Sequence, residues 1–281
     1  MKISGNSRSA GLGGLSLFLY RAAIAGTYLR TTILQMLRWL FRSRETTNFT
    51  YDLTPLNIDY LAALITEVTG QPFNIIRGYM DELENDAQLR RHIAAATLAN
   101  GGGVADPHAR YGRRLGWYAL VRATRPRLVV ETGVDKGLGS CVLAAALLRN
   151  AAEGFPGKYV GTDINPRAGY LFSGAYGECG TIICGDSITS LEQLTGEIDL
   201  FVNDSDHSAA YEQREYEAIA GKLGPRAVII GDNAHCTDKL LQFARMTGRS
   251  FLYFAEKPAD HWYPGAGIGI AFTRRQQQLG L

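Results

Sequence analysis

This sequence of 281 residues has little excess of one charge sign, no Cys-x-x-Cys pair and no long uninterrupted apolar run. The 29 Lys and Arg residues nearly balance the 27 Asp and Glu residues, so the formal net charge is only +2. Such a small charge argues against a general nucleic-acid binder. A membrane span needs about 18 or more apolar residues, and Arg21, Arg30 and Arg38 interrupt the only candidate segment. The sequence therefore predicts a folded protein without a transmembrane helix.

Four cysteines are present, and they form no Cys-x-x-Cys pair and no spacing typical of a metal site. We interpret Cys141, Cys179, Cys184 and Cys236 as reduced, mostly buried thiols of an intracellular protein. The first twenty residues loosely resemble a signal peptide, but Arg21 stands where the apolar region should lead into a cleavage site. The expected location is therefore the cytoplasm.

An amphipathic helix is predicted over residues 15–42. Its apolar positions fall on one face at helical spacing: Leu15, Phe18, Ala22, Leu29, Ile33, Met36 and Leu40. Arg38 and Arg42 lie on the opposite face, near Trp39. The apolar stripe either packs on the body of the protein or on a second subunit of a homo-oligomer, or it lies on an anionic membrane surface.

Further helices are expected before residue 115. Thr54 and Pro55 mark the start of a second helix, which should end at Gly70. A third helix is predicted from Ile75 to about Leu98. Because this part has no strand pattern, we expect two regions: a helical region over 1–115, serving as lid or oligomerisation surface, and a catalytic domain over 116–281.

The stretch from Ala109 to Arg127 contains six arginines together with Trp117 and Tyr118. Such a run is usually a solvated helix face, but it could also help to hold an acidic substrate.

From residue 128 onward, short β-branched runs alternate with helical patterns. The predicted strands are 128–132, 158–163, 181–184, 198–203, 227–230, 251–254 and 267–273. Alternation of this kind indicates a parallel sheet with helices on both faces. The last two strands are joined by a short loop without room for a crossover helix, so they should be antiparallel. The predicted fold class is α/β, with a Rossmann-like, mostly parallel seven-stranded sheet, an antiparallel last strand and an N-terminal helical appendage.

The ends of the first three strands carry residues suited to a nucleoside-containing ligand. The first strand runs into a Gly-x-x-x-Gly-x-Gly turn beginning at Gly133, which differs from the spacing of dinucleotide-binding enzymes. The second strand ends at Asp163, whose carboxylate could accept both ribose hydroxyls. The third leads into Asp186 and Ser187, which could face an adenine ring. Each acidic residue could also simply cap the helix that follows.

Two further strands deliver oxygen ligands to the same edge of the sheet. Asp204 follows the fourth strand, and Asp232 with Asn233 follows the fifth. Hard oxygen donors of this kind suit Mg²⁺ or a similar divalent cation, which would relieve the repulsion between the carboxylates. The alternative is that Asp204 and Asp232 only cap helices.

The motifs Glu131-Thr-Gly-x-x-x-Gly, Gly161-Thr-Asp163, Gly185-Asp186-Ser187, Asp204-Ser-Asp206-His207 and Asp232-Asn233 occur in this order. In order and spacing they resemble the class I S-adenosylmethionine-dependent methyltransferases. Within that group the chain is most similar to the metal-dependent O-methyltransferases, which include catechol-type enzymes and sugar O-methyltransferases of antibiotic pathways. The resemblance covers residues 117–274.

This resemblance implies a cofactor site, a metal site and a base. Eight residues would form the site for S-adenosylmethionine: Glu131, Thr132, Gly133, Gly137, Ser140, Asp163, Asp186 and Ser187. Gly133 and Gly137 would line the methionine moiety, Asp163 would hold the ribose, and Asp186 with Ser187 would lie near the adenine. Three residues, Asp204, Asp232 and Asn233, match the metal ligands.

The identity of the base stays open between two neighbouring residues. Catechol-type members have a lysine three residues after the first metal ligand, where this chain has His207. Sugar-modifying members have a carboxylate two residues after that ligand, which Asp206 matches. We therefore expect methyl transfer to a hydroxyl of a sugar, a glycoside or a related small molecule, with catechol-type transfer or a non-catalytic binding module as alternatives.

The loop before the last strand, His261 to Ala266, holds more aromatic residues than a turn requires. Trp262 and Tyr263 either pack on the sheet edge or the N-terminal helices, or they form a wall of the acceptor pocket.

Overall fold

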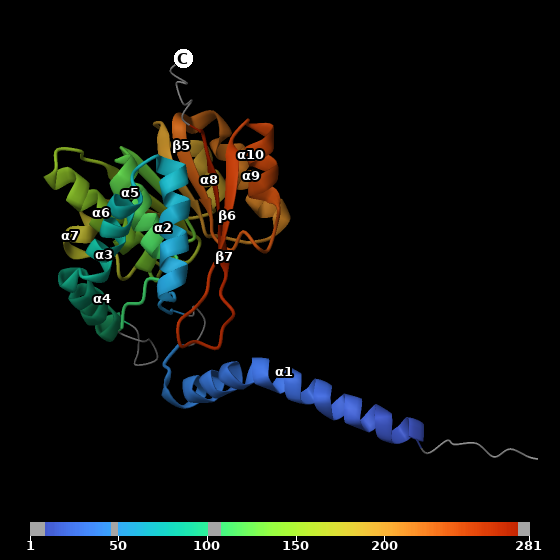
Figure 1. Ribbon diagram of the computed structural model, residues 1–281. Coiled ribbons are helices and arrows are strands. Elements are labelled where there is room, and N and C mark those ends of the chain that lie inside the picture. Colours follow the sequence, from blue (N-terminus) through green and yellow to red (C-terminus); the bar gives the residue numbers. More distant parts are fainter. Residues whose placement is uncertain (1–8, 46–49, 101–107, 275–281) are drawn as a thin grey trace, which may run out of the picture.

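The computed structural model describes residues 9–45, 50–100 and 108–274 of the chain (Figure 1). Its centre is a seven-stranded sheet in the order β3-β2-β1-β4-β5-β7-β6. The strands are β1 (Leu128–Thr132), β2 (Lys158–Asp163), β3 (Gly180–Cys184), β4 (Ile198–Asn203), β5 (Leu223–Gly231), β6 (Ser250–Ala255) and β7 (Gly267–Phe272). Only β7 runs antiparallel to its neighbours, β5 and β6. The predicted fold class is confirmed, and β1, β2 and β4 have the predicted bounds.

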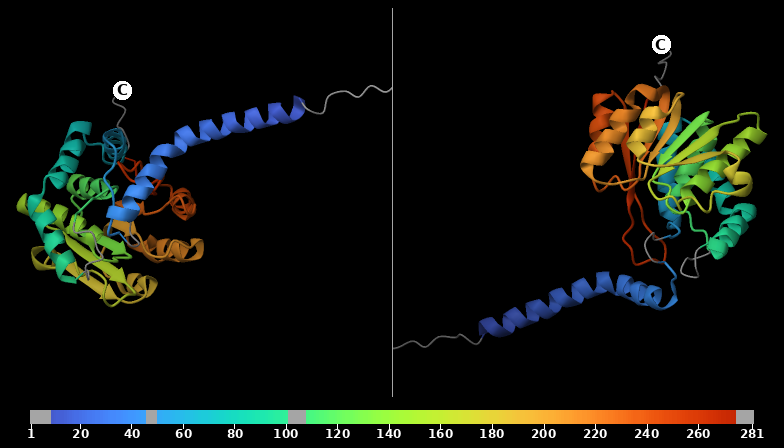
Figure 2. Two further views of the ribbon diagram at one scale, coloured as in Figure 1. Left: turned by 90° about the horizontal axis from the view of Figure 1, so that it is seen from below. Right: turned by 180° about the vertical axis from the view of Figure 1, so that it is seen from behind.

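Helices cover both faces of the sheet because successive side chains of each strand point to opposite sides (Figure 2). Val129 belongs to one apolar core and Val130 to the other. The first core is completed by α2 (Pro55–Thr69), α3 (Phe73–Glu84), α4 (Ala87–Asn100), α5 (Arg114–Thr124), α6 (Leu138–Ala152) and α7 (Gly174–Gly177). The second is completed by α8 (Ser187–Gln193), α9 (Ala209–Ile219) and α10 (Lys239–Met246). A short 3-10 helix over Ala220–Lys222 follows α9.

The N-terminal helices pack directly on the sheet domain. Side chains of α2, α3 and α4 share one continuous core with α5, α6 and β1, so residues on either side of the predicted boundary at 115 are packed together. The predicted helix after Thr54 is confirmed: it begins at Pro55, and Gly70 ends it with a φ of 68°.

The prediction of one helix from Ile75 to Leu98 is wrong, because the chain forms α3 and α4 instead. The break lies at Asn85 and Asp86. The Asp86 carboxylate accepts a hydrogen bond from the Leu89 backbone N–H at 2.8 Å, which caps the new helix. The Asn85 amide donates to the Asp81 carbonyl oxygen at 2.8 Å, which ends the previous one.

The first helix, α1 (Ser9–Arg42), projects away from the rest of the protein in every view (Figures 1 and 2). The amphipathic helix predicted for residues 15–42 is thus confirmed. Its described side chains are exposed except those of Gln35 and Trp39, which are half-buried near its C-terminal end. Within the described residues, no helix is long and apolar enough to cross a membrane.

Burial corrects two predictions made from the sequence. The arginine-rich stretch is not a solvated face, because most of α5 is buried and Arg122 forms ion pairs with Glu82 and Glu153. The four cysteines are all free thiols, but only Cys141 is buried. Cys184 and Cys236 are exposed, so the prediction of mostly buried cysteines is wrong.

Candidate active site

A cavity of about 810 Å³ lies at the carboxyl ends of the parallel strands. Its wall includes residues that follow β1, β2, β3, β4 and β5, as expected for ligand sites in open α/β sheets. The opposite wall comes from the N-terminal region, including Glu45, Thr50 and Tyr51. The cavity therefore spans the predicted cofactor residues and the predicted acidic cluster, with the helical region closing one side.

The glycine turn after β1 brings two loops of the cavity into close backbone contact. Gly133 has a φ of 80°, and a Cβ atom there would lie 1.9 Å from the Asp204 carbonyl oxygen. Glycine is thus the residue that this approach requires. Gly137, the residue before α6, also has a positive φ, of 93°, and lies against the backbone of Gly169.

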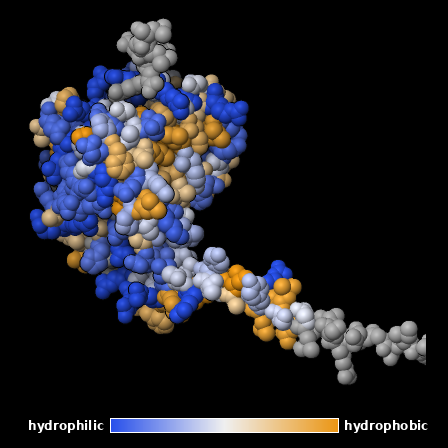
Figure 3. Space-filling model, in the orientation of Figure 1, coloured by the Kyte–Doolittle hydropathy of each residue, from blue (hydrophilic) through white to orange (hydrophobic). Residues whose placement is uncertain are grey.

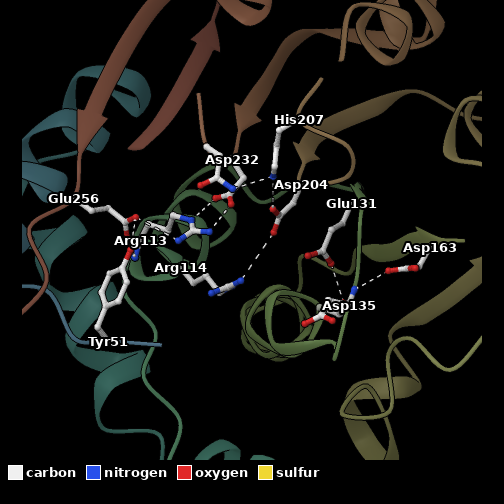
Figure 4. Close-up of polar contacts among 12 residues, drawn as sticks. Tyr51, Arg113, Arg114, Glu131, Asp135, Asp163, Asp204, His207, Asp232 and Glu256 are labelled. Carbon is white, nitrogen blue, oxygen red and sulfur yellow. Dashed lines mark hydrogen bonds and ion pairs between the residues drawn. The ribbon is translucent and has the colours of Figure 1, made fainter. Parts of the chain in front are cut away.

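Asp163 lies at the end of β2 and lines the cavity. One of its carboxylate oxygens accepts a hydrogen bond from the Asp135 backbone N–H at 2.8 Å, and the other accepts from the Asn165 backbone N–H at 2.8 Å (Figure 4). These bonds fix the carboxylate between the first two strand ends, where the ribose was predicted.

Glu131 is buried at the end of β1 beneath the same turn. Its carboxylate accepts hydrogen bonds from the Ser140 hydroxyl at 2.8 Å and from the Tyr159 hydroxyl. Burial raises the pKa of Glu131 to about 7, although both hydroxyl donors favour the charged form. Glu131 lines the cavity, whereas Thr132 and Ser140 are completely buried beside it and support the turn from below.

A pH-dependent stability is expected from Glu131. Its pKa is about 7 in the folded chain against 4.5 in a solvated glutamate, so the folded state holds a proton that the unfolded state has lost. The stabilising contribution of the protonated Glu131 side chain to folding is fully present below pH 4.5 and is lost as the pH rises through about 7. In the Glu131→Gln variant we expect this pH-dependent fall in the free energy of unfolding, on the order of 1–3 kcal/mol, to be absent. Chemical denaturation between pH 4.5 and 8 measures it, with the exposed Glu192→Gln as control; an unchanged slope in Glu131→Gln would contradict the assignment.

Asp186 and Ser187 lie side by side in the cavity wall at the start of α8. The Asp186 carboxylate accepts from the Thr189 backbone N–H at 2.8 Å and from the Tyr211 hydroxyl at 2.8 Å. These bonds, the backbone bond first, lower the pKa of Asp186. The Ser187 hydroxyl donates to the buried Glu215. Asp186 therefore caps α8, and both residues form part of the cavity wall.

The acidic residues after β4 and β5 lie close together, as expected for residues that follow neighbouring parallel strands. Asp204, His207 and Asp232 each offer a ligand atom, and these three atoms lie within 4.8 Å of one another. The backbone N–H of Asp204 donates to Thr132 O at 2.9 Å, and that of Asp232 donates to Asn203 O at 2.8 Å. The backbone hydrogen bonds of the sheet thus continue one residue beyond β4 and β5, and they hold both carboxylates at the same edge of the sheet.

Arg113 occupies the position where a cation would be expected. Its guanidinium donates to both carboxylate oxygens of Asp232 and lies 3.3 Å from Glu256 on the other side (Figure 4). The Asp232 and Glu256 side chains are 0% exposed and that of Arg113 is 12% exposed. Glu256 also accepts from the Tyr51 hydroxyl at 2.8 Å. A buried network of one cation and two carboxylates therefore joins α5, β5 and the N-terminal region.

A second arginine lies close to the other carboxylate of the cluster. Arg114 stands 4.0 Å from Asp204 and stacks over the Trp117 ring at 5.2 Å. Burial and the Asp232 carboxylate raise the pKa of Asp204 well above its usual range. Burial also acts on Asp232, but the Arg113 guanidinium outweighs it and lowers the pKa of Asp232. The cluster thus holds one carboxylate firmly ionised beside one that retains its proton more readily.

One of the predicted metal ligands is already occupied by a cation of the chain itself, because both oxygens of Asp232 are paired with Arg113. The Asn233 amide nitrogen lies 2.9 Å from His207 Nε2, which leaves its Oδ1, the atom that would bind a metal, outside that contact. A metal ion at this position would have to displace a buried guanidinium from a bidentate pair, which is among the strongest polar contacts in proteins.

The two candidate bases differ in what surrounds them. Both line the cavity, but Asp206 is exposed and its carboxylate accepts from the Ser208 backbone N–H at 2.8 Å, at the start of α9. His207 is half-buried, with Nε2 3.7 Å from Asp204 and Nδ1 3.6 Å from Glu212. The Asn233 amide nitrogen lies 2.9 Å from Nε2, so both ring nitrogens of His207 face polar groups.

The aromatic loop before β7 divides its side chains between two surroundings. Tyr263 lines the cavity. Trp262 packs edge-on against Trp39 of α1, with ring centroids 5.3 Å apart. Trp262 thus packs against the N-terminal region, as one interpretation of the loop predicts, and Tyr263 forms part of a cavity wall, as the other predicts.

Sequence reasoning missed Arg113, Arg114, Glu256 and Tyr211. Arg113 belonged to a run in which all six arginines looked alike, and its acidic partners lie 119 and 143 residues further along the chain. The possibility that the run helps to hold an acidic group was the only signal that could have found it.

The comparisons with known proteins agree with this geometry. Residues 130–234 match the family model of a methyltransferase domain. The O-methyltransferase TomG from Streptomyces achromogenes, involved in tomaymycin synthesis and solved with S-adenosylmethionine, is similar in structure: 17% identity, 68% of this chain and 92% of that chain covered, TM-score 0.51. A methyltransferase from Geobacter sulfurreducens is 18% identical, covering 70% of this chain and 94% of that one, TM-score 0.51. No curated protein matches the sequence.

The family model matches residues 130–234, and the fold is shared with solved methyltransferases. The shared fold agrees with the resemblance to methyltransferases seen in the motifs.

Proposed function

We propose that the chain transfers a methyl group from S-adenosylmethionine to a hydroxyl of a small molecule, with a sugar or glycoside as the preferred class. The observation that supports this most is the single cavity that joins two sets of groups. Asp163, Asp186 and the Gly133 turn form one end, and His207, Asp204 and Arg113 form the other. Its volume of about 810 Å³ accommodates a nucleoside-containing cofactor beside an acceptor.

The acceptor end suits a ligand with several hydroxyl groups. Glu45, Thr50, Arg113 and Arg114 supply polar side chains there, and Tyr263 supplies an aromatic face. Sugar rings combine hydroxyl groups with an apolar face, so this mixture supports a sugar over a purely aromatic acceptor.

His207 is the base in this proposal. The acceptor hydroxyl takes the place of the Asn233 amide at Nε2 and gives its proton to that nitrogen, while Glu212 faces the Nδ1–H and stabilises the imidazolium. When bound, S-adenosylmethionine supplies an electrophilic methyl group, so the acceptor oxygen needs alignment and proton removal rather than further activation. Asp206 is the alternative base, but its carboxylate already accepts a hydrogen bond from the Ser208 backbone N–H.

Positive charge beside the acceptor oxygen comes from arginine in this proposal. Arg113 and Arg114 both line the cavity next to Asp204. Their guanidinium groups stabilise negative charge that develops on the oxygen as the proton leaves. The alternative is the predicted metal-assisted reaction, in which Asp204, Asp232 and Asn233 bind Mg²⁺ after Arg113 has moved away.

Methyl transfer is expected to continue in excess EDTA, within about twofold of the untreated rate, because Arg113 holds both oxygens of Asp232. Activity on a panel of glycosides and phenols, with and without EDTA, measures this, and calorimetry with Mn²⁺ provides a reading that does not depend on turnover. Loss of activity in EDTA that Mg²⁺ restores would support Asp204, Asp232 and Asn233 as metal ligands instead.

The assignment as an enzyme is tested separately by calorimetry with S-adenosylmethionine. A methyltransferase must bind this cofactor, whereas a binding module that has only kept the fold need not. Absence of both cofactor binding and methyl transfer across the panel would contradict the proposed function.

A further inference from the structure

The helix α1 leaves a large apolar surface without a partner in the described part of the chain. Phe18, Leu29, Ile33 and Leu40 of its apolar stripe are 47–66% exposed. Figure 3 shows this apolar surface along the projecting helix, interrupted by hydrophilic residues. Contiguous exposed apolar surface of this kind marks an interaction site rather than an ordinary protein surface.

The charge of α1 is entirely of one sign. Its 34 residues contain Arg21, Arg30, Arg38 and Arg42 and no Asp or Glu. All four arginines are exposed, and within the described residues none forms an ion pair with an acidic side chain. An apolar stripe with cationic and aromatic flanks complements a surface that is apolar within and anionic outside.

Among the described residues, the contacts of α1 with the body of the protein lie at its C-terminal end. The Trp39 indole N–H donates to Glu45 Oε2 at 2.6 Å, and its ring packs against Trp262. Glu45 Oε2 in turn lies 3.1 Å from His261 Nε2. This contact fixes where the helix leaves the body, while the part before it projects away (Figure 2).

We propose that α1 binds along the surface of an anionic phospholipid bilayer. The stripe enters the boundary between headgroups and acyl chains, and the arginines contact lipid phosphates. A second copy of the chain is a poorer occupant, because two α1 helices packed side by side would bring cationic residues together without an acidic partner. The absence of acidic residues and the aromatic Tyr20 and Tyr28 on the exposed helix favour the lipid surface.

The position of the cavity gives this binding a functional meaning. Arg44 and Glu45, which follow α1 closely, line the cavity wall. A bilayer-bound α1 therefore holds this wall of the cavity close to the lipid surface. This step does not depend on the proposed methyl transfer, because lipid binding requires only the helix.

Flotation of the full chain with vesicles tests the proposal. We expect binding to vesicles of phosphatidylcholine mixed with phosphatidylglycerol, weak binding to phosphatidylcholine alone, and a steep loss of binding as salt increases. Changing the four arginines of α1 to Gln should weaken binding about 100-fold or more, whereas changing the same four to Lys should preserve it. Phe18→Glu combined with Leu29→Glu should abolish it.

Control measurements distinguish the ways in which the proposal could fail. These side chains are exposed, so melting temperature and methyl transfer to a water-soluble acceptor should remain unchanged in every α1 variant. Absence of binding to the anionic vesicles at low salt would overturn the proposal. So would light scattering that shows an oligomer lost in the Phe18→Glu, Leu29→Glu variant while vesicles remain unbound, since the occupant would then be a second copy.

Discussion

Replacement of Arg113 by Met is expected to lower the free energy of unfolding by about 3–5 kcal/mol. The change leaves Asp232 and Glu256 buried and 0% exposed, without the cation that compensates them. An uncompensated buried carboxylate must either remain ionised in a poor environment or take up a proton. Denaturant unfolding measures the loss, which should diminish at low pH, where Asp232 takes up a proton.

Arg127→Met is the matched control. Arg127 also faces two carboxylates, of Glu197 and Asp199, but its side chain is 77% exposed. Exposed ion pairs contribute about 0–1 kcal/mol, so this variant should be nearly as stable as the wild type. Equal losses in the two variants would contradict the view that burial of the Arg113 network makes it important.

Replacement of His207 by Gln is expected to lower kcat by about 10²–10⁴-fold with little change in the affinity for S-adenosylmethionine. Glutamine can still contact Asn233 but cannot take up the proton of the acceptor. The predicted cofactor residues Asp163, Asp186 and Ser187 remain untouched by the change. Steady-state kinetics together with cofactor calorimetry separate the two effects.

Asp206→Asn is the control for this measurement. It keeps an acceptor oxygen for the Ser208 backbone N–H and removes only the negative charge. We expect kcat to fall less than threefold. The opposite pattern, with a large loss in Asp206→Asn and a small one in His207→Gln, would make Asp206 the base.

The strands of the sheet could be predicted because their signal is local. The β1, β2 and β4 segments are short runs that contain β-branched or aromatic residues, and most of their residues are buried. The rule that parallel strands end at one edge then placed Asp163, Asp204 and Asp232 around one cavity. These steps need no knowledge of distant contacts.

Contacts between distant residues account for what the sequence did not reveal. The pairing of Arg113 with Asp232 depends on how α5 packs against the sheet, which no local pattern encodes. The break between α3 and α4 was missed for a different reason. The buried residues Leu83 and Leu89 are six positions apart, which changes the buried face, and the capping bonds of Asn85 and Asp86 mark where one helix ends and another begins.

The close approach of Gly133 to the Asp204 carbonyl group has a consequence for ligand binding. The turn predicted to hold the methyl donor and the loop that carries Asp204 and His207 touch through their backbones, without a side chain that could yield between them. A ligand that shifts one loop must therefore shift the other, so the free energy of binding at the two ends of the cavity is coupled and each ligand changes the affinity for the other by the same factor. Calorimetric titration of each ligand in the absence and presence of the other would measure this coupling as a change in its dissociation constant.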